Sequence, residues 1–443
     1  MKNKIPNILF LLFMATFATL VMPSIASAQQ PVPERPRILI STDIGGTDPD
    51  DNQSMMHYLL YCNEFECEGL ISSPSYGTGD KSEILRMIDL YEEDLPKLKQ
   101  HAHRYPSADY LRSITKQGAR GAAPLCGFST PTEGSEWIIR CARKSYSSPA
   151  AGKQMEPLYV LVWGGLDDVA QALHDAPDIA EKIRVYWIGG PNKKWSVNSY
   201  IYIIENFPNL WMIENNSSYR SFISNYKNPD QWNGGFYDHY AKGCGYLGED
   251  FGRYLGGKPK LGDTPSLLYM MDGDPAKPER ESWGGSFEKY AYTPRHVFHH
   301  TTSAKDTAMI YSIIEWHVKG PQRADLTIGQ PCITLHIAKQ DWEGYYMGNG
   351  DYMVRYSTYK TGTQPYSITS EIKGFPAQNG FITIVNTFPG VRRKTDYAVG
   401  NQWYSDKKEE GERWDDHQGA LTIFRWRKDV IEDWGKRCAW LKE

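Results

Sequence analysis

Four aspartates lie within nine positions near the start of the chain, directly after a short apolar run. The run over residues 38–42 is followed, in a glycine-containing turn, by Asp43, Asp48, Asp50 and Asp51. With no Lys or Arg among them, these carboxylates repel one another, and a hard cation with oxygen ligands would compensate for the repulsion. Apolar runs of this kind are typical of buried parallel strands, and ligands bind outside the carboxyl ends of such strands. The sequence predicts a cation site here. The alternative is a solvated acidic turn that caps the next helix.

The composition limits the classes of protein that this chain can represent. A length of 443 residues is enough for two domains, or for one large domain with an insertion. A net charge of -4 gives no electrostatic case for nucleic acid or an anionic membrane as a partner. The 14 Trp and 29 Tyr are unusual, because aromatic faces stack on sugars and bases as well as filling cores.

Residues 1–28 have the organisation of a signal peptide. A basic start with Lys2 and Lys4 precedes an apolar stretch over residues 8–21, and small residues at 26–28 precede Gln29. No Cys follows the small residues, so a lipid anchor is not expected. We expect the mature chain to be exported, to the periplasm or the medium, without a membrane anchor.

Seven cysteines are scattered along the chain, at positions 62, 67, 126, 141, 244, 332 and 438. Export makes disulfides possible, and the closest pair, Cys62 and Cys67, could form a bridge. An odd number leaves one thiol unpaired, and no zinc spacing such as CxxC occurs. A structural role or inert burial is expected for all seven.

Strand-like and helix-like segments alternate after residue 36, which predicts an α/β domain over residues 36–319. Repeated strand-turn-helix units imply a parallel sheet with helices on both faces. Glycines at the strand ends, as at 164–165 and 189–190, let the backbone approach a ligand closely. The expected strands cover residues 37–41, 65–72, 158–163, 185–188 and 210–213, and the expected helices cover 52–61, 81–92 and 167–174.

The pattern changes near residue 320. Residues 331–338 alternate like a strand, and Asn349-Gly350 lies between two apolar segments, which is typical of a hairpin. Two more strands are expected at 366–372 and 380–385. These segments predict a small antiparallel β subdomain over residues 320–394. The C-terminal segment, 395–443, is expected to return to the first domain through a helix over residues 420–441.

Several blocks of sequence resemble nucleoside hydrolases. The chain is most similar to a divergent exported branch of nucleoside hydrolase-like proteins (DUF1593), some of which are described as cellulose-binding. The resemblance covers about residues 36–290 and extends to 403–440, and it implies a nucleoside hydrolase-like fold. The blocks are Asp43 with Asp50-Asp51, residues 69–77 (GLISSPSYG), 161–165 (LVWGG), 206–210 (NFPNL), 262–266 (GDTPS) and 283–285 (WGG).

The resemblance implies a Ca²⁺ site and a catalytic base. Its calcium ligands would be Asp43, Asp51, Asp263 and the backbone carbonyl of Trp163, which suits the six to eight oxygens that Ca²⁺ takes. The metal would hold sugar hydroxyls and a water of lowered pKa, and Asp43 would accept the proton from that water. Nearby carboxylates would stabilise the oxocarbenium-like state through which an N-glycosidic bond breaks.

Other residues are candidates for contact with the substrate. Asp50, Thr78 and one of Asn192 or Asn198 are expected to hold the sugar ring. Thr78 could instead cap the next helix, and Asn198 could be a turn residue. Trp283 could stack on a sugar or base, or close the floor of the pocket.

The sequence also departs from the pattern of nucleoside hydrolases. The aspartate turn is three residues longer, Ser41 replaces an earlier Asp, and Asp48 has no clear counterpart. Gly262 stands where a His commonly precedes the late metal-binding Asp and aids departure of the leaving group. The metal half of the site is therefore retained, and the half that recognises the base is altered.

Three other sets of residues have weaker claims to chemistry. His299-His300 could supply an acid, but they have no partner at metal spacing and are expected to be surface or core histidines. Asp167-Asp168 is expected to start a helix, where carboxylates favour the dipole. Ser75 and Ser266 lack the context of a nucleophile elbow, which argues against a serine hydrolase.

These observations lead to two main hypotheses from different classes. The first is an exported, calcium-dependent hydrolase of N-glycosidic bonds in a ribosyl or related glycosyl compound, such as a nucleoside-like substrate. The second is a non-catalytic carbohydrate-binding protein that grips polysaccharide with the calcium site and an aromatic surface. A third possibility is a degenerate scaffold whose β subdomain contacts another protein.

Overall fold

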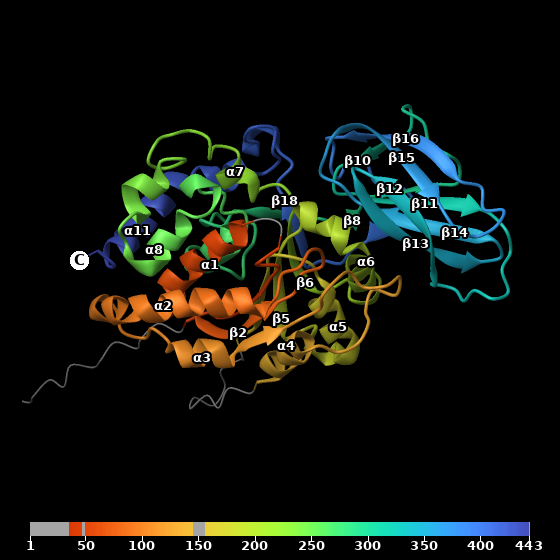
Figure 1. Ribbon diagram of the computed structural model, residues 1–443. Coiled ribbons are helices and arrows are strands. Elements are labelled where there is room, and N and C mark those ends of the chain that lie inside the picture. The colour runs from red at the N-terminus through yellow and green to blue at the C-terminus, as the bar shows by residue number, and fades with distance from the viewer. Residues whose placement is uncertain (1–34, 47–48, 145–155, 443) are drawn as a thin grey trace, which may run out of the picture. The chain divides into compact units, whose positions relative to one another are not determined.

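The computed structural model describes residues 35–46, 49–144 and 156–442 (Figure 1). The expected signal peptide and Asp48 lie outside the described residues. These described residues form one compact unit.

The first sheet has eight strands, and every neighbouring pair is parallel except the pair at one edge, β18 and β7. The central strands are buried along their whole length because helices cover both faces, which is why they are continuous apolar runs. The predicted parallel sheet is therefore confirmed. In order across the sheet, the strands are β3 (Thr115–Gln117), β2 (Glu66–Ser72), β1 (Arg37–Thr42), β4 (Leu158–Val162), β5 (Ile183–Ile188), β6 (Trp211–Asn215), β18 (Trp403–Asp406) and β7 (Phe287–Lys289).

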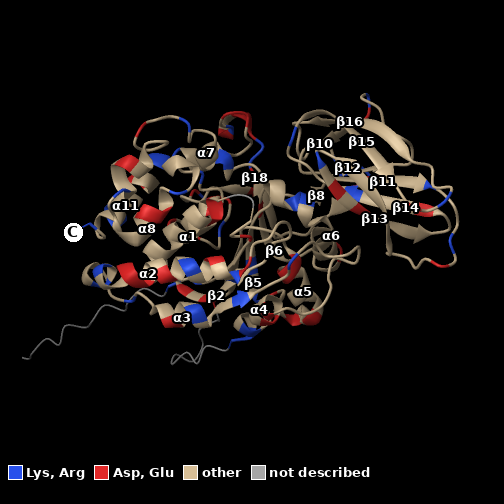
Figure 2. Cartoon of the chain, in the orientation of Figure 1, with Lys and Arg blue, Asp and Glu red and all other residues tan. Residues whose placement is uncertain are grey.

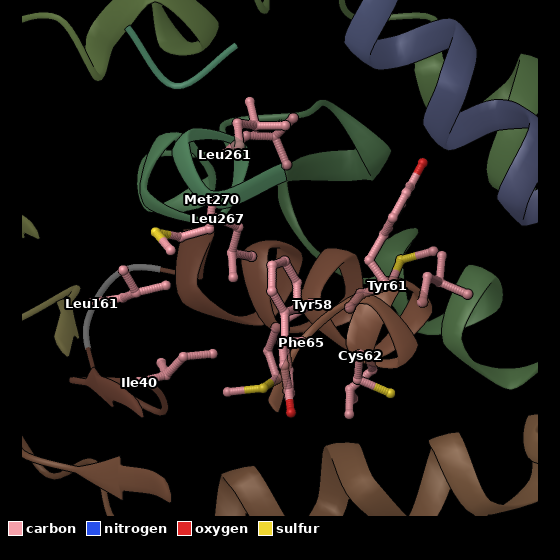
Figure 3. Packing of buried hydrophobic residues seen from close by; sticks show 14 of the residues in the cluster. Ile40, Tyr58, Tyr61, Cys62, Phe65, Leu161, Leu261, Leu267 and Met270 are labelled. Carbon is pink, nitrogen blue, oxygen red and sulfur yellow. The ribbon is translucent and has the colours of Figure 1, made fainter. Parts of the chain in front are cut away.

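Alternate residues of the sheet face two separate layers of helices. Ile40 and Leu161 belong to the same buried cluster as Tyr58 and Leu267, and Figure 3 shows these side chains together. Leu39 belongs to the cluster on the other face. The α-helices are α1 (Asp50–Tyr61), α2 (Lys81–His101), α3 (Ala108–Ser113), α4 (Glu133–Arg143), α5 (Asp167–Asp175), α6 (Val197–Asn206), α7 (Arg220–Ile223), α8 (Gly245–Phe251), α9 (Thr264–Met271), α10 (Leu421–Phe424) and α11 (Arg427–Ala439).

Short helical turns connect these elements. The turn η3 follows β5 and contributes to the site described below. The turns are η1 (Cys62–Glu64), η2 (Pro177–Ile179), η3 (Gly190–Trp195), η4 (Tyr237–Ala241), η5 (Leu255–Gly257) and η6 (Glu410–Glu412). Of the described helices, none is both long and apolar enough to cross a membrane.

The second sheet is mostly antiparallel, and it begins before residue 320, at Arg295. Its first two strands have only four and three residues, which hides them in the sequence. The hairpin at Asn349-Gly350 is present, and both residues have positive φ (52° and 69°), as a two-residue hairpin turn requires. In order across the sheet, the strands are β10 (Thr307–Met309), β16 (Gln378–Val385), β15 (Gly362–Thr369), β12 (Pro331–Ile337), β13 (Gln340–Gly348), β14 (Asp351–Tyr356), β11 (Ile313–Lys319) and β9 (Arg295–Phe298). A separate pair joins β8 (Tyr292–Thr293) to β17 (Tyr397–Ala398).

After the second sheet, the chain returns to the first domain. β18 enters the parallel sheet between β6 and β7, and α11 then packs its Val430 and Trp434 side chains into the cluster that contains Ile40. The single helix expected over 420–441 is two helices, α10 and α11.

The seven cysteines form no disulfide, and all of them lie in the described part of the chain. Cys62 and Cys67, the pair that could have bridged, are both buried as free thiols. Cys126 is exposed and Cys332 is only partly buried, so inert burial does not apply to these two.

Candidate metal and substrate site

The candidate site lies where the order of strands in the parallel sheet reverses. β1 pairs with β2 on one side and β4 on the other, so the connections after β1 and β4 lead in opposite directions. Asp43 directly follows β1, and Trp163 directly follows β4. The backbone N–H of Trp163 donates to the carbonyl of Ser41 over 2.7 Å and holds the two strand ends side by side. A Cβ added at Gly164 would lie 2.9 Å from the Cβ of Asp43, so this close approach requires glycine.

The first turn of α1 brings two further carboxylates to this edge. Asp50 and Asp51 are 8% and 4% exposed, and Figure 2 shows the acidic start of the helix. The hydroxyl of Thr42 donates to the carboxylate of Asp51 and accepts from the backbone N–H of Ile44 over 3.0 Å. The ammonium of Lys260 lies 3.4 Å from Oδ1 of Asp50. The end of β1 therefore positions Asp51 directly.

The segment before α9 supplies the last carboxylate, from Asp263. The Ser266 hydroxyl donates to the carbonyl of Asp263 over 2.8 Å and accepts from the indole Nε1–H of Trp163 over 2.7 Å. These two bonds tie the segment to the end of β4. As a result, carboxylate oxygens of Asp50, Asp51 and Asp263 all lie within 4.8 Å of one another.

The environment of Asp263 is costly for a lone carboxylate. Burial raises its pKa well above the usual range, and the carboxylates of Asp51, Asp50 and Asp43 raise it further, while Lys260 acts in the opposite direction. Its Oδ2 atom is buried and has no hydrogen-bond partner within the described chain. A hard divalent cation would satisfy this oxygen and offset the repulsion, so the residues present fit such an ion.

The glycine before Asp263 has a steric cause. A Cβ added at Gly262 would lie 2.1 Å from Oδ2 of Asp50. No side chain fits at this position while Asp50 stays in place. A His here, as nucleoside hydrolases commonly have, is incompatible with this arrangement of carboxylates.

Asn192, in η3, reaches the end of β4. Its side-chain amide donates to the carbonyl of Trp163 over 2.8 Å and to that of Ile188 over 3.0 Å. A carbonyl oxygen has two lone pairs, so this bond leaves one free for another partner. The role of the Trp163 carbonyl as a metal ligand stays a prediction.

The carboxylates border a cavity of about 160 Å³. Its volume is that of about five water molecules, or of one small ring. The β-rich domain contributes Tyr359, which follows β14, to the wall of this cavity. The lining residues are Asp43, Asp50, Asp51, Tyr76, Trp163, Ile188, Pro191, Asn192, Lys194, Trp195, Tyr219, Arg220, Ile223, Lys260, Asp263 and Tyr359.

Six of the nine residues predicted from the sequence meet at this cavity, namely Asp43, Asp50, Asp51, Trp163, Asn192 and Asp263. The other three lie elsewhere. Asn198 lines a neighbouring cleft, Thr78 is exposed, and Trp283 packs against the core of the parallel sheet. The cap of α2 is Asp80, which accepts from the backbone N–H of Ser82 over 2.8 Å, so the alternative role of Thr78 as a cap is also not observed.

Apart from Trp163, the cationic and aromatic residues of the cavity were not predicted from the sequence. Only its position, three residues before the predicted ligand Asp263, indicated that Lys260 could reach the site. Lys194 and Trp195 follow Asn192 in η3, and their side chains could not be placed from a single irregular turn. No sequence pattern indicated Tyr359, because it belongs to the β-rich domain.

The weaker candidates have structural roles. Asp167 and Asp168 do start α5, and both are buried, which raises the pKa of each. They also bind distant loops, because Asp167 accepts from the Ser75 hydroxyl and Asp168 accepts from the backbone N–H of Ala119 over 2.8 Å. His299 and His300 are exposed in the β-rich domain, as expected.

The chain is similar to several known proteins. The chain is similar to a nucleoside hydrolase-related protein of Saccharophagus degradans associated with carbohydrate metabolism, with 19% identity over 80% of this chain and 100% of that one, and a TM-score of 0.48. It is also similar to an inosine-uridine preferring nucleoside hydrolase of Bacillus anthracis, with 15% identity over 59% of this chain and 86% of that one, and a TM-score of 0.35. No match was found among curated proteins. The family model described as "Cellulose-binding Sde182, nucleoside hydrolase-like domain" matches residues 37–287, and the chain therefore belongs to this family.

Proposed function

We propose that this protein is an exported, calcium-dependent hydrolase of N-glycosidic bonds in ribosyl or related glycosyl compounds. The observation that carries the proposal is the set of three converging carboxylates at the strand-order reversal, one of which has a buried oxygen without a partner. Such a site suits a hard cation beside a ring-sized cavity.

Five groups would hold the calcium ion and the attacking water. Asp43, Asp51, Asp263 and the Trp163 carbonyl would be the ligands, and Asp50 borders the same space. When bound, calcium would orient a water and sugar hydroxyls and lower the pKa of that water. Asp43 is less buried than the other carboxylates and lines the cavity, so it can accept the proton of the water as general base.

The same carboxylates serve the second requirement of the reaction. A glycosidic carbon gains positive charge as its bond breaks, and fixed negative groups in a partly dry cavity stabilise that charge. Trp195 and Tyr359 wall the cavity and restrict the entry of bulk water. The geometry thus supports charge stabilisation and proton transfer within one small volume.

A non-catalytic carbohydrate-binding role is the second candidate. The family description "Cellulose-binding" favours it, together with a second cleft, rich in aromatic residues, beside the cavity. In that case the cation would orient sugar hydroxyls without hydrolysis.

A hydrolysis screen of nucleosides and aryl glycosides, with and without chelator, tests the proposal. We expect release of base or aglycone that calcium restores after chelation. Asp43→Ala should lose bound calcium and hydrolysis while keeping a cooperative unfolding transition. Asp238→Ala is the matched control, because this side chain is 80% exposed and lies outside the cavity. Unchanged calcium content in Asp43→Ala contradicts the site, and retention on insoluble glycan without any hydrolysis favours the binding role.

Export is tested separately by N-terminal sequencing of the mature protein from its native cells. Cleavage after Ala28 would leave Gln29 as the first residue. A mature chain that still begins at Met1 contradicts export through this segment.

A further inference from the structure

We propose that a second cleft, beside the aspartate cavity, binds a neutral sugar unit, so that the ligand of this protein is a saccharide of at least two units. The inference rests on the proposed function only in assigning the first unit to the aspartate cavity. The cleft measures about 260 Å³. Its lining residues are Ser75, Tyr76, Ala122, Ala123, Lys194, Trp195, Ser196, Val197, Asn198, Asp341, Trp342, Glu343, Tyr345 and Arg355.

The cleft and the aspartate cavity are adjacent. Tyr76, Lys194 and Trp195 line both of them. Neither space alone reaches the range of small-molecule sites, roughly 300–1,000 Å³, but the two volumes together do. A ligand that spans the shared wall would place one ring in each space.

Both domains build the cleft, and hydrogen bonds fix its walls. The amide of Asn198, in α6, donates to the hydroxyl of Tyr345, in β13, over 3.0 Å. Arg355, in β14, donates to Oδ1 of Asn198 over 3.2 Å and pairs with the buried Glu315 at 3.1 Å. A site whose walls are already fixed loses less conformational entropy when a ligand binds.

The charges of the lining favour a neutral ligand with many hydroxyls. Lys194 and Arg355 are the cations of the lining, and Asp341 and Glu343 are its anions. The opposite charges are equal in number, so neither an anion nor a cation is selected. Side chains of both kinds can pair with sugar hydroxyls, each of which donates and accepts.

The aromatic rings of the shared wall leave an open face for stacking. Tyr76 and Trp195 stack on each other with centroids 4.9 Å apart and planes 9° apart, so no base fits between them. Tyr76 is still 43% exposed and offers a flat surface to the C–H groups of a sugar.

Two indole groups add hydrogen-bond capacity to the cleft. The Nε1–H groups of Trp195 and Trp342 are buried and have no acceptor among the described residues. An unsatisfied buried donor costs about 1–3 kcal/mol. Both nitrogens are closed off from solvent, so a sugar oxygen reaches them only when the indole side chains shift as the ligand enters.

Calorimetric titration of the full mature chain in calcium tests the inference. The probes are cellobiose, xylobiose and maltose, each beside its monosaccharide, and inosine beside hypoxanthine. We expect one disaccharide to bind more tightly than its monosaccharide. Trp342→Ala should weaken that disaccharide by about tenfold, the loss of roughly 1.4 kcal/mol, and leave the affinity of the monosaccharide unchanged. Trp342→Phe, which keeps a ring but removes the N–H, should have an intermediate effect.

Phe381→Ala is the matched control, because it removes an aromatic ring of the same domain that is 49% exposed and lines neither space. It should bind all probes as the wild type does. Calcium binding should be unchanged in both Trp342 variants, which shows that they fold. The inference is overturned if no disaccharide binds more tightly than its monosaccharide, or if inosine alone depends on Trp342. Tight disaccharide binding, together with no release of base or aglycone in the hydrolysis screen, would sink the proposed reaction and leave the second sugar site standing.

Discussion

Replacing Asp263 with Asn should stabilise the calcium-free protein at neutral pH and remove its response to calcium. The side chain is 3% exposed, and its oxygens lie within 4.8 Å of those of Asp50 and Asp51. At that distance and an effective dielectric constant of about 20, two unit charges repel by about 3.5 kcal/mol. The folded chain avoids this repulsion by keeping a proton on Asp263, whose pKa is raised well above the usual range.

The retained proton makes stability depend on pH with a definite sign. Below the ordinary Asp pKa of 3.8, the folded and unfolded chains both carry the proton, and the group contributes nothing. As the pH rises above that value, only the unfolded chain releases it. The free energy of unfolding then falls by about 1.4 kcal/mol per pH unit, until the folded-state pKa is reached. Asn has no such proton, and no side-chain cap bond of α9 is lost with it.

Urea unfolding at about pH 5 and about pH 8, in chelator and in calcium, measures both effects. Wild type should gain about 2.7 kcal/mol when calcium is present at 100 times its dissociation constant, and Asp263→Asn should gain nothing. Asp238→Asn, at an exposed position, should behave as wild type. The reasoning is refuted if Asp263→Asn is less stable than wild type in chelator at the higher pH, or if calcium still stabilises it.

Three further substitutions probe other parts of the fold. Gly262→Ala places a Cβ 2.1 Å from an oxygen of Asp50, and we expect a loss of about 1–3 kcal/mol in urea unfolding and a clearly weaker calcium affinity by calorimetry. Equal affinity would show that Asp50 can move away. His57 is buried and neutral, with its pKa lowered to about 3 by burial, so stability is lost as the pH falls from 6.5 towards 3 because only the unfolded chain takes up the proton. In His57→Phe, the slope of the free energy of unfolding against pH in this acid range should fall by about 1.4 kcal/mol per pH unit. An unchanged slope in acid unfolding contradicts a neutral, buried His57. Lys193 pairs with Glu214 inside the protein, so Lys193→Met should cost about 3–5 kcal/mol in thermal unfolding, and adding Glu214→Gln should recover part of that loss.

The parallel sheet and the carboxylate cluster were predictable from the sequence because each depends on a simple rule. Apolar runs that end in glycine identify strands covered on both faces, and the carboxyl ends of such strands meet at one edge. Asp43 and Asp51 follow one of these strands. Asp263 could be added only through the family resemblance, since 212 positions separate it from Asp51.

The rest of the site depends on irregular segments that carry no periodic signal. Lys194 comes from a short helical turn, and Tyr359 comes from the second domain. The packing of the two domains brings both residues to the cavity. Thr78 directly follows one matching block and Trp283 begins another, but the Thr78 side chain is exposed and the Trp283 side chain packs against the core. The early start of the second sheet, at Arg295, was hidden because its first strands are only three or four residues long.

The insertion of β18 between β6 and β7 has a consequence for how this chain is synthesised. The strand that completes the parallel sheet leaves the ribosome only after the whole β-rich domain has been made. The β-rich domain can therefore finish folding while the first domain still exposes the edge of β6. An exposed strand edge can pair with other chains. A shortened gene that stops at residue 287, where the family match ends, would fix the protein in that unfinished state, without α11 and without the Trp434 ring that fills the core. Expression of the first domain alone would need residues 403–442 joined back to it.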